Sequence, residues 1–287
     1  MTNQLFINNE FIESQSKETM DVINPATGEV FDTITLATEE EVNDAIEKSQ
    51  QAQLEWERVP QPTRAEHVKL LIPLLEKNRD EIAQLYVKEQ GKTLAQAYGE
   101  IDKSISFIDY MTSLSMSDKG RVLQNSIANE TIQIINKPIG VTAGIVPWNA
   151  PILVLMRKVI PAIVTGCSVV IKPSEETTLL TLRLAELFRA STIPAGLIQI
   201  VPGTGETVGT QLASHKDIQL ISLTGSMRAG KSVYENAAQT VKKVNLELGG
   251  NAPVIVTSNA DLDKAVDYIV TARINNAGQV CLSLIHI

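Results

Sequence analysis

Two side chains toward the end of the chain are of types that could carry out covalent chemistry together. Glu247 lies in the stretch LELGG at 246–250, and Cys281 ends the stretch GQVC at 278–281. A thiol attacks carbon only as the thiolate, which is scarce at neutral pH because the usual pKa of cysteine is about 8.5. A nearby carboxylate, acting directly or through water, can take the proton. The pair therefore indicates a nucleophile and a base.

Each of these residues also has a plainer interpretation when it is taken alone. Cysteine is commonly a small buried hydrophobic residue, and a glutamate at the end of a strand is commonly a partly solvated charge. Glu247 follows an apolar run and precedes Gly249 and Gly250, so we expect it where a strand ends and the backbone turns sharply. A side chain at such a turn faces a cleft rather than bulk solvent.

The elements that must position these residues change character at Pro138. From there, short apolar runs alternate with helix-length stretches, and the runs lie at 141–146, 168–172, 197–201 and 220–224. This alternation predicts an α/β fold with a doubly wound parallel sheet, which binds ligands at the carboxyl ends of its strands. The sequences that follow the strands are PWN at 147–149, KPSE at 172–175, GTGETVG at 203–209 and TGSMRAG at 224–230.

Two of these sequences contain glycine turns. Gly225 and Ser226 open an expected helix, whose first N–H groups and dipole can hold a pyrophosphate, although the same residues cap ordinary helices. Gly205 lies in GTGETVG, whose third glycine comes one position late for the G-x-G-x-x-G dinucleotide pattern. We interpret Gly205 first as part of a tight turn and helix start, and second as a cofactor contact.

The first part of the chain is predicted to be a helical scaffold. Residues 6–14 alternate as a strand pair with a turn at Asn8 and Asn9. Helices are expected after capping boxes that begin at Thr38, Thr63 and Thr93. We expect the aromatic and imidazole side chains of these helices to pack or to lie at the surface, rather than in a site, namely Trp56, His67, Phe107 and Tyr110.

Three further segments complete the expected architecture. Residues 121–137 contain two strand-like runs around a polar turn that includes Ala128, which predicts a β-hairpin. After Glu247 come an expected strand at 253–257 and an expected helix at 261–278. A two-stranded ribbon is marginal alone, so the hairpin is either an ordinary surface feature or part of an assembly contact.

Composition and charge narrow the class of protein. The chain has 287 residues, 44% of them hydrophobic, which is enough for about two domains and a sizeable core. Its formal charge of −8 argues against general binding to nucleic acid or to an anionic membrane. Two cysteines and no evident secretion signal point to the reducing cytoplasm. We predict no metal site.

The stretch 151–171 is the most apolar part of the chain and approaches a membrane span in length. Arg157, Lys158 and Pro161 lie in its first half, and charged residues are costly inside a bilayer. We therefore expect a buried helix followed by a buried strand, with Cys167 in the core.

Taken together, the motifs resemble those of the NAD(P)-dependent aldehyde dehydrogenase superfamily. The resemblance rests on NPATGE at 24–29, followed by PWN, KPSE, LELGG and GQVC, and it covers nearly the whole chain. It implies a Rossmann-like NAD-binding domain of residues 1–120 and 138–247, a β-hairpin oligomerisation arm at 121–137, and the start of a second α/β catalytic domain at 248–287. It also implies a homodimer or homotetramer.

The resemblance implies a role for each motif. Asn149 would stabilise, with the backbone N–H of Cys281, the oxyanion formed when the thiolate attacks an aldehyde; the alternative is that Asn149 caps a helix that begins near Pro151. Lys172 and Glu175 would hold the adenosine ribose, and a carboxylate there repels a 2′-phosphate, which favours NAD over NADP. The remaining residues expected to contact NAD are Ile145, Pro147, Trp148, Gly205, Gly225, Ser226 and Leu248.

The implied reaction converts an aldehyde to a carboxylate and yields NADH. Cys281 attacks the aldehyde, the thiohemiacetal transfers a hydride to the nicotinamide, and Glu247 deprotonates the water that hydrolyses the thioester. Branches that pass the acyl group to coenzyme A usually lack a carboxylate at the position of Glu247, so its presence favours hydrolysis. The short sequences FIDYM, GETVG and NNAGQVC are similar to those of the lactaldehyde and glycolaldehyde dehydrogenase branch. Betaine-aldehyde and semialdehyde dehydrogenases share much of these sequences.

The chain departs from the family pattern after Cys281. Family members continue through most of the catalytic domain, whereas this sequence reads LSLIHI at 282–287 and ends. We expect a truncated reading frame or a foreign last segment, with poor solubility and little activity from these 287 residues alone. The competing interpretation is therefore a catalytically inactive nucleotide-binding or interaction fragment of such an enzyme.

Overall fold

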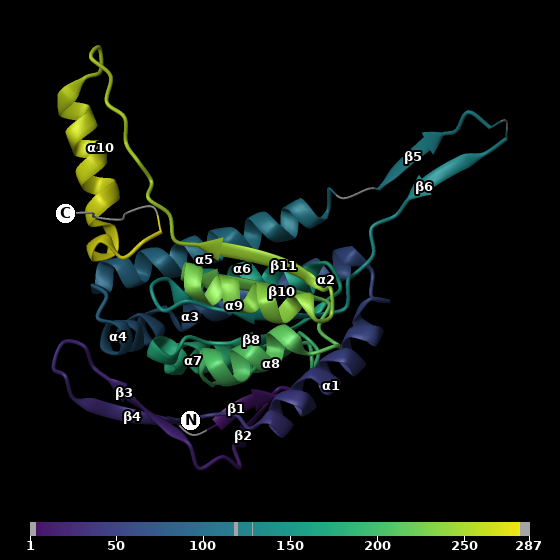
Figure 1. Cartoon of the computed structure of the whole chain (residues 1–287), viewed down its shortest axis with the longest axis horizontal. Coiled ribbons are helices and arrows are strands. Elements are labelled where there is room, and N and C mark those ends of the chain that lie inside the picture. The colour runs from purple at the N-terminus through teal and green to yellow at the C-terminus, as the bar shows by residue number, and fades with distance from the viewer. Residues whose placement is uncertain (1–3, 118–119, 128, 282–287) are drawn as a thin grey trace.

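A seven-stranded sheet lies at the centre of the molecule, in the strand order β11-β10-β7-β8-β9-β1-β2 (Figure 1). The structure is a computed structural model that describes residues 4–117, 120–127 and 129–281. Five neighbouring strands run parallel, namely β7 (Val141–Ile145), β8 (Ser168–Lys172), β9 (Ile198–Ile200), β10 (Leu220–Gly225) and β11 (Lys243–Leu248). The predicted α/β class is confirmed, and each of the four predicted apolar runs overlaps a strand of this sheet.

Helices cover both faces of the sheet (Figure 1). The core on one face includes α1 (Glu39–Trp56), α8 (Thr210–Ser214) and α9 (Met227–Ala238). The core on the other face includes α2 (Gln61–Lys69), α3 (Leu71–Lys77), α4 (Arg79–Gln90), α5 (Leu94–Ser115), α6 (Pro151–Val164) and α7 (Thr178–Ala190). Because both faces are covered, every residue of β7 and β8 is buried, which explains why these strands read as continuous apolar runs.

The N-terminal hairpin extends the sheet at one edge. The predicted turn is confirmed, since Asn8 and Asn9 have φ of 54° and 65° between β1 (Gln4–Ile7) and β2 (Glu10–Glu13). Phe6 of β1 pairs antiparallel with Ile200 of β9. The sequence predicted the hairpin but not its place in the main sheet.

Two ribbons and one helix lie outside the central layers (Figure 1). One ribbon consists of β3 (Thr19–Ile23) and β4 (Val30–Thr35), and the other consists of β5 (Arg121–Gln124) and β6 (Thr131–Ile134). The hairpin predicted at 121–137 therefore forms, and it projects away from the body; Ala128 of its predicted turn lies outside the described residues. Helix α10 (Leu262–Ile274) projects on another side and has no buried residue; it leads into η3 (Asn275–Gly278).

Two predictions of local structure are wrong. The capping box at Thr63 does not form, because α2 begins at Gln61 and already contains Thr63, with Pro62 in its first turn. No strand forms at 253–257, where Ile255 is 86% exposed. Within the described residues this segment has no neighbouring strand, and an unpaired backbone does not gain from an extended ladder. The box predicted at Thr38 forms and caps α1, and Thr93 caps α5 by accepting from the N–H of Gln96.

The apolar stretch 151–171 folds as predicted, with α6 followed by most of β8. Cys167 between them is 4% exposed and belongs to the core. Among the described residues, the helices fall short of the combined length and apolar character that a membrane crossing requires. The segment 282–287, in which the departure from the family pattern is expected, lies outside the described residues.

Candidate active site

The carboxyl ends of four parallel strands bring most of the predicted site residues to one edge of the sheet. Ile145, at the end of β7, is in register with Lys172 at the end of β8. Gly225, at the end of β10, is in register with Leu248 at the end of β11. Pro147 and Trp148 follow β7 after one intervening residue, and Trp148 is 39% exposed. Parallel strands bind ligands at this edge, so the arrangement fits a cofactor crevice.

Lys172, Glu175 and Gly205 form one polar cluster at the end of β8. Nζ of Lys172 lies 3.1 Å from Oε2 of Glu175 and donates to the carbonyl of Pro173 at 2.7 Å. The N–H of Gly205 donates to Oε1 of Glu175 at 2.8 Å. Burial lowers the pKa of Lys172, and the charge of Glu175 raises it. Because the side chain of Glu175 is 34% exposed, its carboxylate can also accept hydrogen bonds from ribose hydroxyls.

The two glycine turns behave as helix starts. Gly205 opens the π-helical turn η2 (Gly205–Gly209), which confirms its first interpretation. Oγ of Ser226 accepts from the N–H of Ala229 at 3.2 Å and caps α9. A helix start leaves other N–H groups without a partner in the helix, so the cap still allows an anion to bind there. A side chain at Gly205 would meet no atom within 4 Å, so this glycine leaves open space beside Glu175.

Asn149 is joined to the loop that carries Cys281. Its side-chain amide donates to the carbonyl of Gln279 at 2.8 Å. The side chain of Asn276 donates to the carbonyl of Asn149 at 3.2 Å and to that of Gln279 at 3.3 Å. The alternative role of Asn149 as a helix cap is wrong, because Ala150 occupies the cap position of α6 and no side chain of the cap residue bonds there. Cys281 itself is exposed.

Glu247 lies on β11 and is exposed, opposite Thr224 of β10. Lys158 of α6 contacts the neighbouring strand β10. Its Nζ donates to Oγ of Ser222 at 2.9 Å and to Oγ1 of Thr224 at 3.1 Å. Burial lowers the pKa of Lys158 to about 8, and the charge of Glu247 raises it. In the described part of the chain no hydrogen bond joins Glu247 to Cys281.

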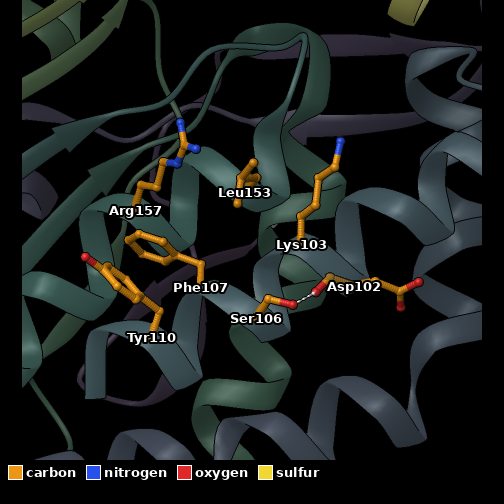
Figure 2. Close-up of a pocket in the computed structure, with 7 residues that line it drawn as sticks. All are labelled: Asp102, Lys103, Ser106, Phe107, Tyr110, Leu153 and Arg157. Atoms are coloured by element: carbon orange, nitrogen blue, oxygen red, sulfur yellow. Dashed lines mark hydrogen bonds between the residues drawn. The ribbon is translucent and has the colours of Figure 1, made fainter. Parts of the chain in front are cut away.

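A cavity of about 440 Å³ opens between α5 and α6 (Figure 2). Its wall is formed by seven side chains, namely Asp102, Lys103, Ser106, Phe107, Tyr110, Leu153 and Arg157. The guanidinium of Arg157 lies 6.0 Å from the centre of the Phe107 ring. As expected, Phe107 packs against the core and Tyr110 is exposed at the surface, and both also line this cavity. Leu153 belongs to the first turn of α6, close to Asn149 in the chain.

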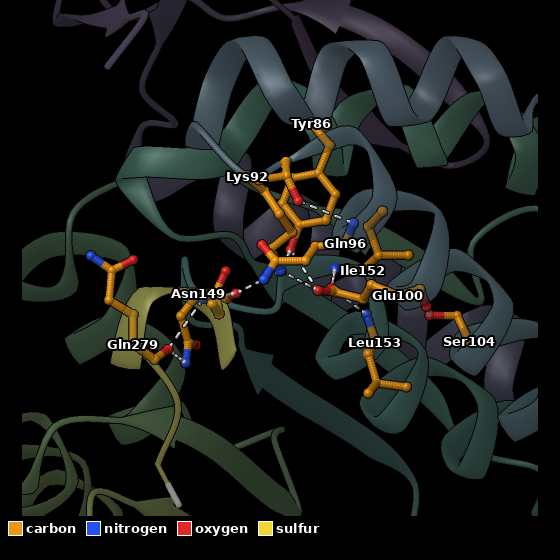
Figure 3. A network of polar contacts seen from close by, with 11 residues as sticks. Tyr86, Lys92, Gln96, Glu100, Ser104, Asn149, Ile152, Leu153 and Gln279 are labelled. Carbon is orange, nitrogen blue, oxygen red and sulfur yellow. Dashed lines mark hydrogen bonds and ion pairs between the residues drawn. The ribbon is translucent and has the colours of Figure 1, made fainter. Parts of the chain in front are cut away.

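Sequence reasoning missed a buried polar cluster behind Asn149, formed by Tyr86, Lys92 and Glu100 (Figure 3). It also gave no role to Lys158. Tyr86, Glu100 and Lys158 lie on three different helices and Lys92 lies in the turn before α5, so no recognisable spacing connects them in the sequence. For metal ligation, the described residues contain no group of three or more His, Cys, Asp or Glu side chains suited to an ion.

Comparison with known proteins agrees with this arrangement. The sequence profile of the aldehyde dehydrogenase family matches residues 11–287. The chain is 38% identical to the glutarate-semialdehyde dehydrogenase of Pseudomonas putida over 279 residues, which are 97% of this chain and 58% of the relative. The same figures hold for the NADP(+) succinate-semialdehyde dehydrogenase of Escherichia coli. The crystal structure of lactaldehyde dehydrogenase from Escherichia coli has a TM-score of 0.95 at 37% identity, with 97% of this chain and 58% of that chain covered. The chain thus spans somewhat more than half the length of these relatives.

Proposed function

The chain belongs to the aldehyde dehydrogenase family of NAD(P)-dependent oxidoreductases, and from this premise we propose that the protein oxidises an aldehyde to a carboxylate with NAD, through a thioester on Cys281. The observation that carries the proposal is the hydrogen bond from the Asn149 side chain to the carbonyl of Gln279. It holds an amide donor from the end of β7 against the loop of the thiol.

The first step is attack of the Cys281 thiolate on the aldehyde carbon. A carbon–sulfur bond forms, and the carbonyl electron pair moves to oxygen. The Asn149 amide has two N–H donors, and Gln279 takes one of them, which leaves the other for this oxyanion. Because Cys281 is exposed, an aldehyde can reach the sulfur.

The second half of the reaction releases the acyl group. Glu247 is exposed at the end of β11, so its carboxylate is accessible to the water that attacks the thioester. The charge of Glu247 raises the pKa of the nearby buried Lys158, which partly offsets the lowering by burial. A general base at this position supports hydrolysis rather than transfer to another acceptor.

The residues at the ends of β8 and β10 fit a dinucleotide. Lys172 and Glu175 offer a cation and a carboxylate beside the open position of Gly205, and the start of α9 at Ser226 offers N–H groups for phosphate. When bound, NAD supplies the acceptor for the two electrons that the aldehyde loses. The charge of Glu175 supports NAD rather than NADP, since it repels a 2′-phosphate.

Two classes of aldehyde are candidates for the open pocket of Figure 2. The likeness of local sequence to lactaldehyde dehydrogenases supports a short 2-hydroxyaldehyde. Lys103 and Arg157 on the cavity wall favour instead an aldehyde with an anionic group, such as a semialdehyde. In a substrate panel, Arg157→Leu should raise the KM of an anionic aldehyde at least about tenfold and leave that of a neutral 2-hydroxyaldehyde nearly unchanged. Equal effects on both would remove the anionic class.

Assembly into a homodimer or homotetramer is proposed on the hairpin β5–β6. Its described residues are almost all exposed and include the apolar Val122, Leu123 and Ile132. An isolated ribbon of this kind gains stability only by packing against another surface. Sedimentation of the protein and of Val122→Lys tests this role.

Both cysteines are free, which supports the cytoplasm as the location of the protein.

The experiment that tests the proposed reaction is NADH formation from an aldehyde, followed by absorbance. We expect Cys281→Ala to abolish it, whereas Cys167→Ala, a matched change at the buried cysteine, should retain it. Activity that survives in Cys281→Ala would remove the thioester route. Binding of NAD without turnover in the unaltered chain would favour the competing interpretation, an inactive nucleotide-binding fragment.

A further inference from the structure

A buried ion pair lies directly behind Asn149 (Figure 3). Lys92 precedes α5, Glu100 lies within α5, and Tyr86 lies on α4. Nζ of Lys92 and Oε2 of Glu100 are 2.7 Å apart, and the two side chains are 5% and 7% exposed. The hydroxyl of Tyr86 donates to the same carboxylate oxygen at 2.6 Å and accepts from Lys92 at 2.7 Å. Burial raises the pKa of Tyr86, which keeps its hydroxyl protonated as a donor.

Both members of the ion pair form hydrogen bonds with the backbone next to Asn149. Oε1 of Glu100 accepts from the N–H groups of Ile152 at 3.1 Å and Leu153 at 3.2 Å, which lie in the first turn of α6. Nζ of Lys92 donates to the carbonyl of Asn149 at 3.2 Å. The cap residue of α6 provides no side-chain hydrogen bond of its own. Glu100 therefore acts as the cap of α6, and Lys92 fixes the peptide just before it.

The carbonyl of Asn149 is also the point where the cysteine loop attaches. It accepts from Lys92 on the scaffold side and from Asn276 on the loop side, each at 3.2 Å. Asn276 has φ of 51°, a left-handed conformation that asparagine adopts more readily than most residues other than glycine. The same Asn276 amide and the Asn149 amide both bond to Gln279. One carbonyl thus links the scaffold, the PWN turn and the loop of Cys281.

We propose that Lys92, held by Glu100, is a positioning residue for the oxyanion site. It fixes the carbonyl of Asn149, and through it the direction of the Asn149 amide relative to Cys281. The inference rests on the proposed function in one respect, since the oxyanion belongs to that reaction. The geometry that Lys92 holds is independent of the reaction.

Stability alone does not account for Lys92. A buried ion pair contributes little net stability, because desolvation of both charges offsets their attraction. Glu89 provides an internal comparison, since it caps α7 through the N–H groups of Leu179 and Leu180 at 2.7 and 2.8 Å, while no lysine or arginine among the described residues forms an ion pair with it. A helix start in this scaffold can therefore be capped without an ammonium. The extra group at α6 is explained by its third contact, with Asn149.

Lys92 is not a base or a nucleophile in this arrangement. An ammonium has three N–H donors, and those of Lys92 have three acceptors in Tyr86, Glu100 and Asn149. The nitrogen lies behind the peptide of Asn149 rather than at the thiol loop. Its effect on the reaction is therefore expected to pass through Asn149.

The test compares Lys92→Met with Glu89→Gln, a matched change in the other buried helix cap. We expect Lys92→Met to lower kcat about tenfold to a hundredfold, less than removal of an oxyanion donor, with the KM for NAD little changed. Glu89→Gln should lower Tm and leave kcat within about twofold. Because Lys92→Met leaves a buried carboxylate unpaired, Lys92→Met/Glu100→Gln serves as a second variant, with the same loss of kcat expected.

Two readouts separate positioning from a structural role. In an Asn149→Ala background, Lys92→Met should lower kcat no further, because its effect passes through the residue already removed. Amide hydrogen exchange at 149–156 and 275–281 should be faster in Lys92→Met and unchanged in Glu89→Gln. An undiminished loss of kcat in the Asn149→Ala background, or a lower Tm with neither kcat nor exchange altered, would overturn the proposal. If the unaltered protein forms no NADH, the proposed function fails, and the exchange comparison alone decides the role of Lys92.

Discussion

The starts of helices α6 and α7 are built alike and serve different ends. Each helix follows a buried parallel strand, and each has its first N–H groups bonded to a buried glutamate from the helical scaffold, Glu100 for α6 and Glu89 for α7. At α6 the carboxylate has an ammonium beside it, from Lys92. At α7 burial raises the pKa of Glu89 to about 8. Both helices are therefore capped by a glutamate, and they differ in whether that glutamate has a lysine as its ion-pair partner.

The residues in the turns before α6 and α7 account for this difference between the two helix starts. The turn before α6 carries Asn149, whose amide, in the proposed reaction, must be aimed at one atom. The turn before α7 carries Lys172 and Glu175, which, in the proposed cofactor site, need only meet the hydroxyls of a bound ribose. Binding tolerates small displacements better than catalysis does. The additional buried charge is found where displacement matters more.

The largest expected effect comes from the α6 turn itself. Asn149→Ala removes the side-chain donor and should lower kcat by about 10²–10³ with little change in the dissociation constant of NAD. Steady-state kinetics and NAD titration measure the two quantities. If NAD binding weakens by the same factor as kcat, the division of labour between the two turns is wrong.

A smaller effect is expected at the α7 turn. Glu175→Gln removes the charge that accepts from ribose hydroxyls and repels a 2′-phosphate, so affinity for NAD should fall about tenfold while affinity for NADP rises relative to it. Titration of both cofactors gives the ratio. A changed kcat at saturating NAD, with an unchanged preference, would contradict the role of Glu175.

The cap of α7 should show itself in the pH dependence of stability. The pKa of Glu89 in the folded state, about 8, lies above the value of 4.5 for an ordinary glutamate, so the folded state binds the proton more tightly than the unfolded state. The stabilisation is complete below pH 4.5 and is lost as the pH rises toward 8. Between pH 5 and 8 the unfolding free energy should fall on the order of 1–3 kcal/mol more in the unaltered protein than in Glu89→Gln, as measured by urea denaturation. Parallel curves would show that Glu89 is not protonated in this way.

The smallest effect is expected for an exposed ion pair on the same scaffold. Lys69 and Asp109 are 3.0 Å apart with side chains 59% and 58% exposed, so water and salt screen their attraction. Lys69→Met should change the unfolding free energy by less than about 1 kcal/mol and leave kcat unaltered. This variant is the baseline for Lys92→Met. A loss of kcat equal to that of Lys92→Met would mean that any scaffold lysine has the same influence.

The parallel strands and the residues at their ends could be predicted from sequence because both are local. Short apolar runs mark buried strands, and the motifs PWN, KPSE and TGSMRAG directly follow them. The strand at 253–257 was predicted by the same rule and does not form, because an apolar run becomes a strand only beside another strand.

The support behind the site could not be predicted. In the sequence, Lys92 looks like an ordinary turn charge and Glu100 like a surface charge of an amphipathic helix, and their partners around Asn149 lie more than fifty residues away in the chain. Only the packing of α5 on α6 reveals that both are buried. The link from Asn149 to Gln279 is likewise a tertiary contact that no local pattern contains.

The most direct test of the account is a single turnover of the Glu247→Gln variant with aldehyde and NAD, followed by mass spectrometry of the intact chain and of its peptides. Without the base, the thioester should accumulate, so we expect one NADH per chain and an added acyl mass on the peptide that contains Cys281. An acyl group on any other residue, or NADH formation without an adduct at Cys281, would contradict the account.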